Sequence, residues 1–345
     1  MAALEVAPVR LALRAPLRTA WGELATRELI SVRLVFSDDD FGCGEAAPLE
    51  PYDGVSLGAV AAALQAYAAV LLRDVGPEDP HADVLAACAA ERDLPQALAA
   101  IDVALWDRAG RRAAVPVAAL LADAPLARVP VNATLGAESR AAAAAQAAAA
   151  VAAGFACLKV KVGIGDDAGR VAAVRAAAGP EAAIRVDANG AWSSPAEALA
   201  NLGALAPARL ELAEEPVHGI EALRAVAAES PVPVAMDETA AEPGASASGA
   251  TPLVCLKVAR CGGIGGLLRD AAAVRAAGGE VYLASSVDGP LGIAAAVHAA
   301  AALGMRRPCG LATLGAFAAV DPGPLAPVDG HVTVPQGPGL LGAPR

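Results

Sequence analysis

The sequence predicts an α/β protein in which a small α+β domain precedes a modified (β/α)8 barrel of the TIM type. Three observations support this prediction. Residues 1–112 begin with alternating, strand-like segments and continue with helical patterns. Residues 113–319 then change to a regular succession of strands and helices. The eight strand-like segments of this second part advance by roughly 20 to 28 residues, which fits a closed parallel barrel better than an open doubly wound sheet.

The first domain is expected to contain a short antiparallel sheet. The segments VRLAL and LISVRLVF alternate in the manner of such strands, and the turn SDDDFG leads to a short third segment, CGEAAP. Helical patterns follow near residues 56–73, 80–91 and 94–112. The last of these, LPQALAAIDVALWDRAGR, spaces its apolar residues at helical intervals.

The barrel strands are predicted, in order, at residues 129–135, 157–163, 183–190, 210–217, 233–239, 253–259, 280–286 and 309–313. Alanine-rich helical stretches lie between most of them. No GxGxxG follows the first strand, so a dinucleotide-binding fold has no support. The turn-rich tail, about residues 320–345, is expected to fold back on the first domain.

Composition and charge limit the class of function. The 345 residues include 26 lysines and arginines against 37 aspartates and glutamates, a net charge of −11, and no basic run. This balance argues against a nucleic-acid partner or an anionic membrane surface, whereas a few lysines inside a cleft can still bind a small anionic carboxylate. The six cysteines are scattered without a CxxC, as expected of reduced thiols in a cytoplasmic protein. The first residues, interrupted by Arg10 and Arg14, show no signal-peptide core.

Charged and polar side chains follow the C-terminal ends of the predicted barrel strands, where the active site of such a barrel lies. In chain order they are Lys159 and Lys161, Asp187 and Asn189, Glu214 and Glu215, Asp237 and Glu238, Lys257, and Ser285, Ser286 and Asp288. Carboxylates that converge from three neighbouring strands form a hard-oxygen site suited to Mg²⁺. No cluster of histidine and cysteine offers a zinc alternative. Glu214 and Glu215 are adjacent and must face opposite ways, so only one of them can be a ligand.

The two lysines of LKVKVG, Lys159 and Lys161, lie on the same face of their strand. Two like charges on a half-buried face are costly unless a neighbouring group needs them. Lysines beside a divalent metal indicate proton transfer next to a carboxylate, because the metal can bind that carboxylate and stabilise the enediolate left when the α-proton departs. The metal and the second ammonium would both lower the pKa of the lysine that acts as base.

These motifs resemble the enolase superfamily and, within it, the muconate-lactonizing-enzyme subgroup. The resemblance covers nearly the whole chain: GEAAP and AIDVALWD in the first domain, then KVK, VDANGAW, EEP, MDET and LKVARCGGIGG in order. It implies that the first domain caps the barrel and that Asp187, Glu214 and Asp237 bind Mg²⁺, for which Mn²⁺ can substitute. A lysine base beside Mg²⁺ is a known pattern of this superfamily.

The resemblance also implies roles for the lysines. Lys161, the second lysine of KVK, would be the catalytic base, Lys159 would tune it, and Lys257 would lie on the opposite face. The segment CGLATLGAFAAVDPGPLAPVDGHV looks most like the o-succinylbenzoate synthases of the subgroup, and it lacks the Asp-x-Asp that dipeptide epimerases carry there. The implied reaction is dehydration of 2-succinyl-6-hydroxy-2,4-cyclohexadiene-1-carboxylate in menaquinone biosynthesis, with Lys161 as base and Lys257 as a stabilising cation.

Substrate contacts are expected from Asn189, Ser285, Ser286 and Asp288. Asp288 stands where many relatives have glutamate, and pairing with Lys257 is an alternative role for it. The loops at residues 18–24 and 50–54 are expected to close over the substrate.

Other functions stay open at this point. The same lysine pair would serve an N-succinylamino acid racemase, a dipeptide epimerase or a muconate-type cycloisomerase. A Schiff-base aldolase and a non-enzymatic barrel are weaker alternatives, since three acids and the lysines are all present. A homo-oligomer is compatible with the resemblance.

Overall fold

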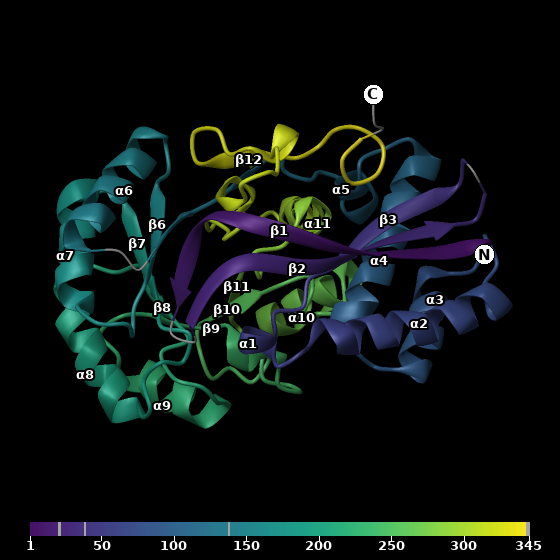
Figure 1. Ribbon diagram of the computed structural model, residues 1–345. Helices are drawn as coiled ribbons and strands as arrows, with labels where there is room; N and C mark the ends of the chain where they lie inside the picture. The colour runs from purple at the N-terminus through teal and green to yellow at the C-terminus, as the bar shows by residue number, and fades with distance from the viewer. Residues whose placement is uncertain (20–21, 38, 137–138, 343–345) are drawn as a thin grey trace.

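A computed structural model describes residues 1–19, 22–37, 39–136 and 139–342, and its ribbon is drawn in Figure 1. The first domain holds an antiparallel sheet in the order β1-β2-β3. Its strands are β1 (Ala3–Thr19), β2 (Gly22–Val35) and β3 (Phe41–Ala46). Its helices are α1 (Glu50–Asp53), α2 (Leu57–Asp74), α3 (His81–Glu91) and α4 (Pro95–Ala113).

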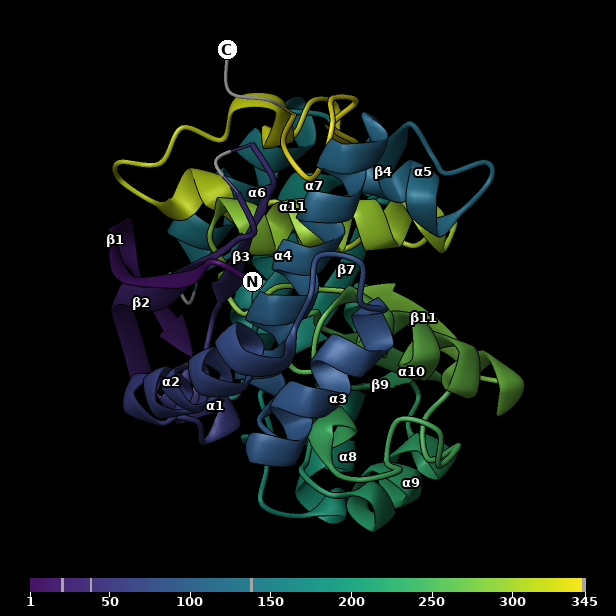
Figure 2. The same ribbon diagram turned by 90° about the vertical axis from the view of Figure 1, so that its right-hand side faces the viewer.

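The first domain has its own hydrophobic core between the sheet and the helices. Val32 and Leu34 of β2 pack there with Leu64 and Tyr67 of α2 and Ile101 of α4. Helix α2 is long and apolar enough to cross a membrane by length and composition alone, and here it contributes its buried face to this core. Helix α4 contacts both the first-domain helices and the barrel helices α10 and α11, so it forms the junction between the two domains (Figure 2).

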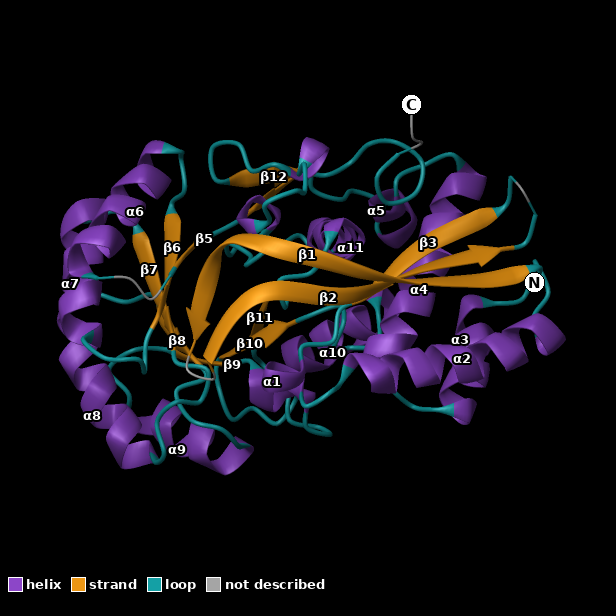
Figure 3. Ribbon diagram, viewed as in Figure 1, coloured by secondary structure: helices purple, strands orange, loops and turns teal. Residues whose placement is uncertain are grey.

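The second domain is built on a curled sheet of parallel strands in the order β11-β10-β9-β8-β7-β6-β5 (Figure 3). The strands are β5 (Ala133–Leu135), β6 (Cys157–Lys161), β7 (Ala183–Asp187), β8 (Leu212–Glu214), β9 (Val234–Met236), β10 (Leu253–Leu256) and β11 (Glu280–Leu283). The helices are α5 (Val117–Leu121), α6 (Arg140–Ala152), α7 (Asp167–Ala178), α8 (Pro195–Leu205), α9 (Ile220–Glu229), α10 (Ile264–Ala276) and α11 (Pro290–Ala302). Short 3₁₀ helices are η1 (Ala206–Ala208), η2 (Glu238–Ala241), η3 (Leu314–Ala316) and η4 (Gly323–Leu325).

The predicted α/β barrel class is confirmed, but the strand expected at residues 309–313 does not form. Only two single-residue bridges occur there: Cys309 pairs with Val131 and Gly310 pairs with Ala284. The chain turns into η3 at Leu314, four residues after Gly310, so the segment ends before a longer ladder can form. These two bridges link the two edges of the seven-stranded sheet.

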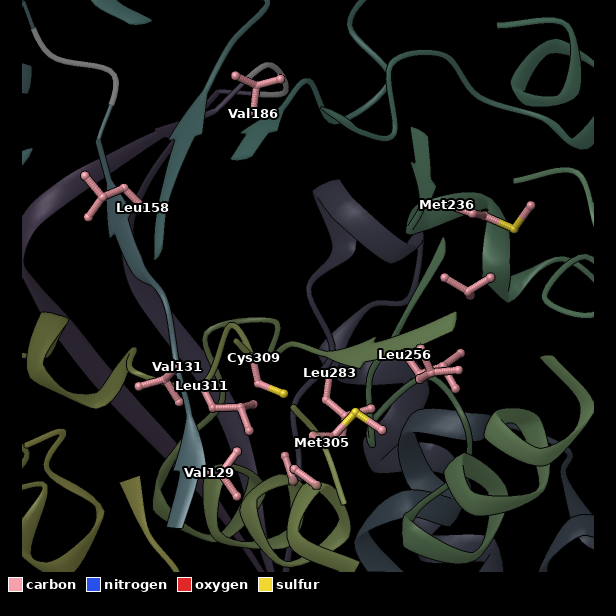
Figure 4. Close-up of a cluster of buried hydrophobic side chains, with 14 of the residues drawn as sticks. Val129, Val131, Leu158, Val186, Met236, Leu256, Leu283, Met305, Cys309 and Leu311 are labelled. Carbon is pink, nitrogen blue, oxygen red and sulfur yellow. The ribbon is translucent and has the colours of Figure 1, made fainter. Parts of the chain in front are cut away.

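The alternation of each barrel strand separates its core face from its site face. Leu158 and Val160 of β6 are fully buried in the hydrophobic core cluster, while Lys159 and Lys161 face the other way. Figure 4 labels Val186 of β7 and Leu256 of β10 among the buried hydrophobic side chains of this core. The apolar face of the sheet therefore fixes the register in which the polar residues reach the site.

The C-terminal tail contacts both domains. Strand β12 (His331–Thr333) pairs with β4 (Arg128–Pro130), at the start of the barrel domain. Upstream of the tail, Phe317 forms a bridge with Leu13 of β1. Near the end of the tail, the Leu340 N–H donates to Asp107 of α4 at 2.8 Å.

Candidate active site

Both lysines of β6 contact the carboxylate that ends the neighbouring strand β7. The Nζ atoms of Lys159 and Lys161 lie 2.8 Å and 2.6 Å from Oδ2 of Asp187. Lys159 also donates to Oε1 of Glu214 at 2.5 Å, and Lys161 donates to Oδ1 of Asn189 at 2.8 Å. Burial alone would lower the pKa of Lys159, but the charges of Asp187 and Glu214 outweigh burial and raise it well above its usual value. The negative charges of these carboxylates thus compensate the two adjacent positive charges of the lysines.

The three predicted metal-ligand carboxylates come from adjacent strand ends. Asp187 and Glu214 are directly opposite each other in the ladder of β7 and β8, and Asp237 follows β9. All three are at most 1 % exposed. Burial raises the pKa of Glu214 to about 7, whereas the lysines beside Asp187 and Asp237 overcome burial and hold their pKa values well below the usual range. Tyr282 donates to Oε2 of Glu214 at 2.7 Å.

Lys257 lies against Asp237 together with Tyr52 and Arg260, two residues outside the predicted catalytic set. Its Nζ donates to Oδ2 of Asp237 at 2.5 Å and also to the hydroxyl of Tyr52. That hydroxyl donates to Oδ1 of Asp237 at 2.8 Å and accepts from Nη1 of Arg260 at 2.6 Å. Both cations lie over the Tyr52 ring, 4.5 Å and 5.1 Å from its centroid. The three-residue spacing from Lys257, about one turn, is the signal that could have identified Arg260.

Glu215 faces away from the site, as the alternation of adjacent residues requires. Its carboxylate accepts the Asp237 N–H at 2.7 Å and both the N–H and the hydroxyl of Thr239, at 2.9 Å and 2.5 Å. His218 contacts the same carboxylate at 3.1 Å. Glu215 therefore shapes the turn after β9 that presents Asp237.

Glu238 is a buried acid beside the proposed ligands. Its Oε1 accepts from Nδ2 of Asn189 at 2.9 Å, and its Oε2 is buried without a partner among the described residues. Burial, followed by the negative charges of Asp237 and Asp187, raises the pKa of Glu238 well above its usual value. An additional cation at this place would relieve that accumulation of negative charge.

Ser285 and Ser286 line the cleft, but Asp288 does not. Asp288 accepts the Ser286 N–H at 3.0 Å, and the positive charges that act on it are Arg27 of β2 and, more weakly, Lys257. No ion pair joins it to Lys257 among the described residues. Burial raises the pKa of Asp288 to about 6. The hydroxyl of Ser286 is buried without a partner in the described part of the chain, which leaves it available to a ligand.

The first domain forms one wall of the cleft, which has a volume of about 60 Å³. This wall consists of Leu17, Thr19, Leu24, Leu49 and Tyr52. The two expected loops thus reach the site, and Figure 1 shows the hairpin end of β1 and β2 beside the strand ends of the barrel. Ala20 and Trp21 of the first loop lie outside the described residues.

The donor atoms fit a hard divalent cation. Among the described residues, Glu214, Asp237 and Cys255 each place one donor atom within 4.8 Å of the others, and the carboxylate of Asp187 is paired in register with Glu214. Burial raises the pKa of the Cys255 thiol well above its usual value, and Mg²⁺ prefers oxygen ligands, so the carboxylates are the favoured donors. Oε2 of Glu238, which has no partner among the described residues, is a further buried oxygen beside these ligands.

A parallel barrel with carboxylates and lysines at its strand ends, covered by an α+β domain, defines one class of barrel enzymes. The chain belongs to the mandelate racemase / muconate lactonizing enzyme family of the enolase superfamily. Residues 1–122 match the mandelate racemase / muconate lactonizing enzyme N-terminal domain, and residues 142–342 match the enolase C-terminal domain-like family. The resemblance predicted from the motifs is thereby confirmed.

Curated relatives include o-succinylbenzoate synthases of several mycobacteria. The enzyme of Mycobacterium tuberculosis (strain ATCC 25618 / H37Rv) is 39 % identical over 218 residues, which cover 60 % of this chain and 64 % of the relative. The chain therefore spans less than two thirds of that relative's length. The enzyme of Mycolicibacterium smegmatis is 36 % identical over 244 residues, covering 68 % of this chain and 72 % of the relative.

Solved structures with the same fold include proteins of other activities. The L-Ala-D/L-Glu epimerase of Bacillus subtilis is 26 % identical with a TM-score of 0.89, and the match covers 100 % of both chains. The muconate lactonizing enzyme of Pseudomonas fluorescens, complexed with muconolactone, is 26 % identical with a TM-score of 0.86, covering 98 % of this chain and 95 % of the other. The dipeptide epimerase of Enterococcus faecalis, complexed with Mg and L-Leu-L-Tyr, is 25 % identical with a TM-score of 0.89, covering 98 % of each chain.

Proposed function

We propose that this protein is a Mg²⁺-dependent lyase that dehydrates 2-succinyl-6-hydroxy-2,4-cyclohexadiene-1-carboxylate to o-succinylbenzoate. The observation that carries the proposal is the cleft in which Lys161 and Lys257 lie with the carboxylates of Asp187 and Asp237. The carboxylate of Glu214 adjoins this cleft through its hydrogen bond to Lys159. The o-succinylbenzoate synthase relatives support the choice of reaction.

The cation would be held by Asp187, Glu214 and Asp237. When bound, it would supply a positive centre for the substrate carboxylate and for the negative charge that develops as the α-proton leaves. The positive charge would also offset the carboxylates that now raise the pKa of Lys159 and Lys257.

Lys161 is the proposed base. In its neutral form, Nζ removes the proton α to the substrate carboxylate, and the ammonium so formed then gives this proton to the departing hydroxyl, which leaves as water. The electron pair of the broken C–H bond becomes part of the aromatic ring of the product. Asn189, which accepts from Nζ at 2.8 Å, orients the lysine.

The remaining lysines act as fixed cations. Lys257 stays protonated and stabilises the negative charge that develops on the substrate, while Lys159 orients Asp187 and Glu214. The unpartnered Ser286 hydroxyl and Ser285 are proposed substrate contacts on the wall of the cleft. Leu17, Leu24 and Leu49 exclude water from the opposite wall.

The test is the kcat/KM for the cyclohexadiene substrate, followed by ultraviolet absorbance with Mg²⁺ and with excess EDTA. We expect a metal-dependent value of about 10⁴ M⁻¹s⁻¹ or more. Lack of turnover with Mg²⁺ present would overturn the substrate assignment. N-succinylamino acids and dipeptides would then be assayed in D₂O, because racemisation by the same lysine pair exchanges the α-hydrogen for deuterium.

The proposal includes a cytoplasmic location. All six cysteines carry free thiols, which fits a reducing compartment.

A further inference from the structure

Two barrel helices follow the active-site loops, and each begins directly after a glycine. At each helix start, a carboxylate of the first domain accepts hydrogen bonds from backbone N–H groups. Helix α10 begins after Gly263, and helix α11 begins after Gly289. Neither helix has a capping side chain of its own. Helices α6, α7 and α8 differ, because Ser139, Asp166 and Ser194 cap them locally.

The carboxylate at α10 belongs to Asp102 of α4. Its Oδ2 accepts the N–H groups of Ile264 at 2.5 Å and Gly265 at 3.2 Å, which are the first two amides of the helix. A Cβ at Gly263 would lie 2.3 to 2.5 Å from atoms of the Asp102 side chain. The glycine is therefore required by the carboxylate as well as by its own φ of +111°.

The carboxylate at α11 belongs to Glu45 of β3. Its Oε1 accepts the Gly289 N–H at 2.7 Å, and a Cβ at Gly289 would lie 2.2 Å from its Oε2. The neighbouring backbone is held by the first domain as well, because Nε of Arg27 donates to the Val287 carbonyl at 3.1 Å. Each helix N-terminus thus meets a first-domain acid in a space that only glycine leaves open.

Each capped helix is continuous with one functional loop. The turn that starts at Lys257 closes through the bonds from the Cys261 N–H to the Lys257 carbonyl, at 3.0 Å, and from the Gly263 N–H to the Val258 carbonyl, at 2.9 Å. Helix α10 begins at the next residue. The segment that carries Ser285 and Ser286 runs in the same way into the start of α11 at residue 290.

We propose that Asp102 and Glu45 are positioning residues through which the first domain sets the two active-site loops separately. Asp102 sets the Lys257 turn, and Glu45 sets the Ser285–Ser286 wall. Lys257 acts on the developing charge, so loosening its turn lowers kcat. The serine wall contacts bound substrate, so loosening it raises KM. These two kinetic effects rest on the proposed function.

The first experiment is independent of substrate. Amide hydrogen exchange, read by mass spectrometry on peptides, is compared for wild type, Asp102→Ala and Glu45→Ala. Asp102→Ala should speed exchange at least tenfold in residues 258–268 and leave residues 285–295 unchanged, and Glu45→Ala should do the reverse. Equal changes in both segments, or none, would refute the proposal whether or not the chain turns over the proposed substrate.

The second experiment is kinetic. Asp102→Ala should lower kcat by about tenfold to a hundredfold with KM within threefold of wild type, because a small misplacement of a charged group has effects of this size. Glu45→Ala should raise KM by a similar factor with a smaller change in kcat. Asp102→Asn keeps an oxygen acceptor at the same place and should restore most of kcat. If the alanine variant does not fold, the asparagine variant still tests the proposal.

Asp107→Asn is the matched control. Asp107 is a buried carboxylate of the same helix, and it accepts the N–H groups of Cys43 and Leu340 rather than those of either loop. This variant should lower the melting temperature and leave both the exchange of the two loops and the kcat and KM of the folded protein within twofold of wild type. If it reproduces the Asp102→Ala pattern, then general loosening of the junction explains the data and the proposal is wrong.

Discussion

Tyr52 offers a sharp test of how the first domain contributes to the site. Its hydroxyl donates to Asp237 and accepts from Lys257 and Arg260, while its ring lies under both cations. Tyr52→Phe removes the hydroxyl and keeps the ring. The two cations retain other acceptors, Oδ2 of Asp237 and the Glu238 carbonyl, so neither is left unpaired.

The expected loss of stability is therefore close to that of one charged hydrogen bond, about 2 kcal/mol. With an unfolding entropy of about 2.1 cal mol⁻¹ K⁻¹ per residue over 345 residues, or about 0.7 kcal mol⁻¹ K⁻¹, the melting temperature should fall by about 3 °C. A partner that orients a metal ligand typically contributes tenfold to a hundredfold in metal affinity. The Mg²⁺ concentration for half-maximal activity should accordingly rise at least tenfold.

The assays are a thermal melt and a Mg²⁺ titration of activity, with Tyr67→Phe as the matched control. The Tyr67 hydroxyl donates to the Arg92 carbonyl inside the first domain, so its loss removes the same chemical group away from the cleft. Tyr67→Phe should lower the melting temperature without changing the Mg²⁺ requirement. An unchanged Mg²⁺ requirement in Tyr52→Phe, or an equal change in both variants, would show that the Tyr52 contact does not orient Asp237.

Three further changes test other parts of the molecule. Lys161→Arg keeps a cation near Asp187 but removes the base, so kcat should fall about 10² to 10⁴-fold with an unchanged circular dichroism spectrum, and near-normal turnover would exclude Lys161 as base. Gly190→Ala places a Cβ 2.0 to 2.3 Å from the His218 ring at a φ of +68°, which should cost about 1–3 kcal/mol in a urea titration. Because the His218 side chain is 56 % exposed, adding His218→Ala should recover part of this loss, and no recovery would assign the whole cost to the backbone. Burial raises the pKa of Asp102 from 3.8 to about 6, so folding favours its protonated form. The free energy of unfolding of wild type relative to Asp102→Asn should fall by about 3 kcal/mol as the pH rises from about 4 to about 6, and a constant difference across this range would contradict the buried acid.

The strand-end residues could be predicted because each depends on local periodicity. Once LKVKVG is a strand with Leu158 in the core, alternation places Lys159 and Lys161 on the opposite face. The same reasoning brings Asp187 and Glu214 together, since parallel strands in register end at the same edge of the sheet. The strand expected at 309–313 failed for a reason that composition conceals. An apolar segment such as CGLAT is compatible with a strand, but the chain turns into η3 at Leu314 and leaves room only for the two single bridges.

The contacts that escaped prediction join residues far apart in the chain. Tyr52 and Asp237 are 185 residues apart, and Asp102 and Ile264 are 162 residues apart. Periodicity indicates which face of an element is buried, but it does not indicate which element of another domain covers that face. The helical pattern around Asp102 does not show whether this acid is buried or exposed. Its burial is tolerated because the backbone N–H groups at the glycine-rich start of α10 donate hydrogen bonds to it. Gly263 is the complementary half of that contact, because its φ of +111° and its closeness to the Asp102 side chain both require the absence of a Cβ. The glycine at position 263 in LKVARCGGIGG therefore makes room for the carboxylate of Asp102. A comparison of related sequences that follows positions 102 and 263 together would detect this contact, which neither position indicates alone.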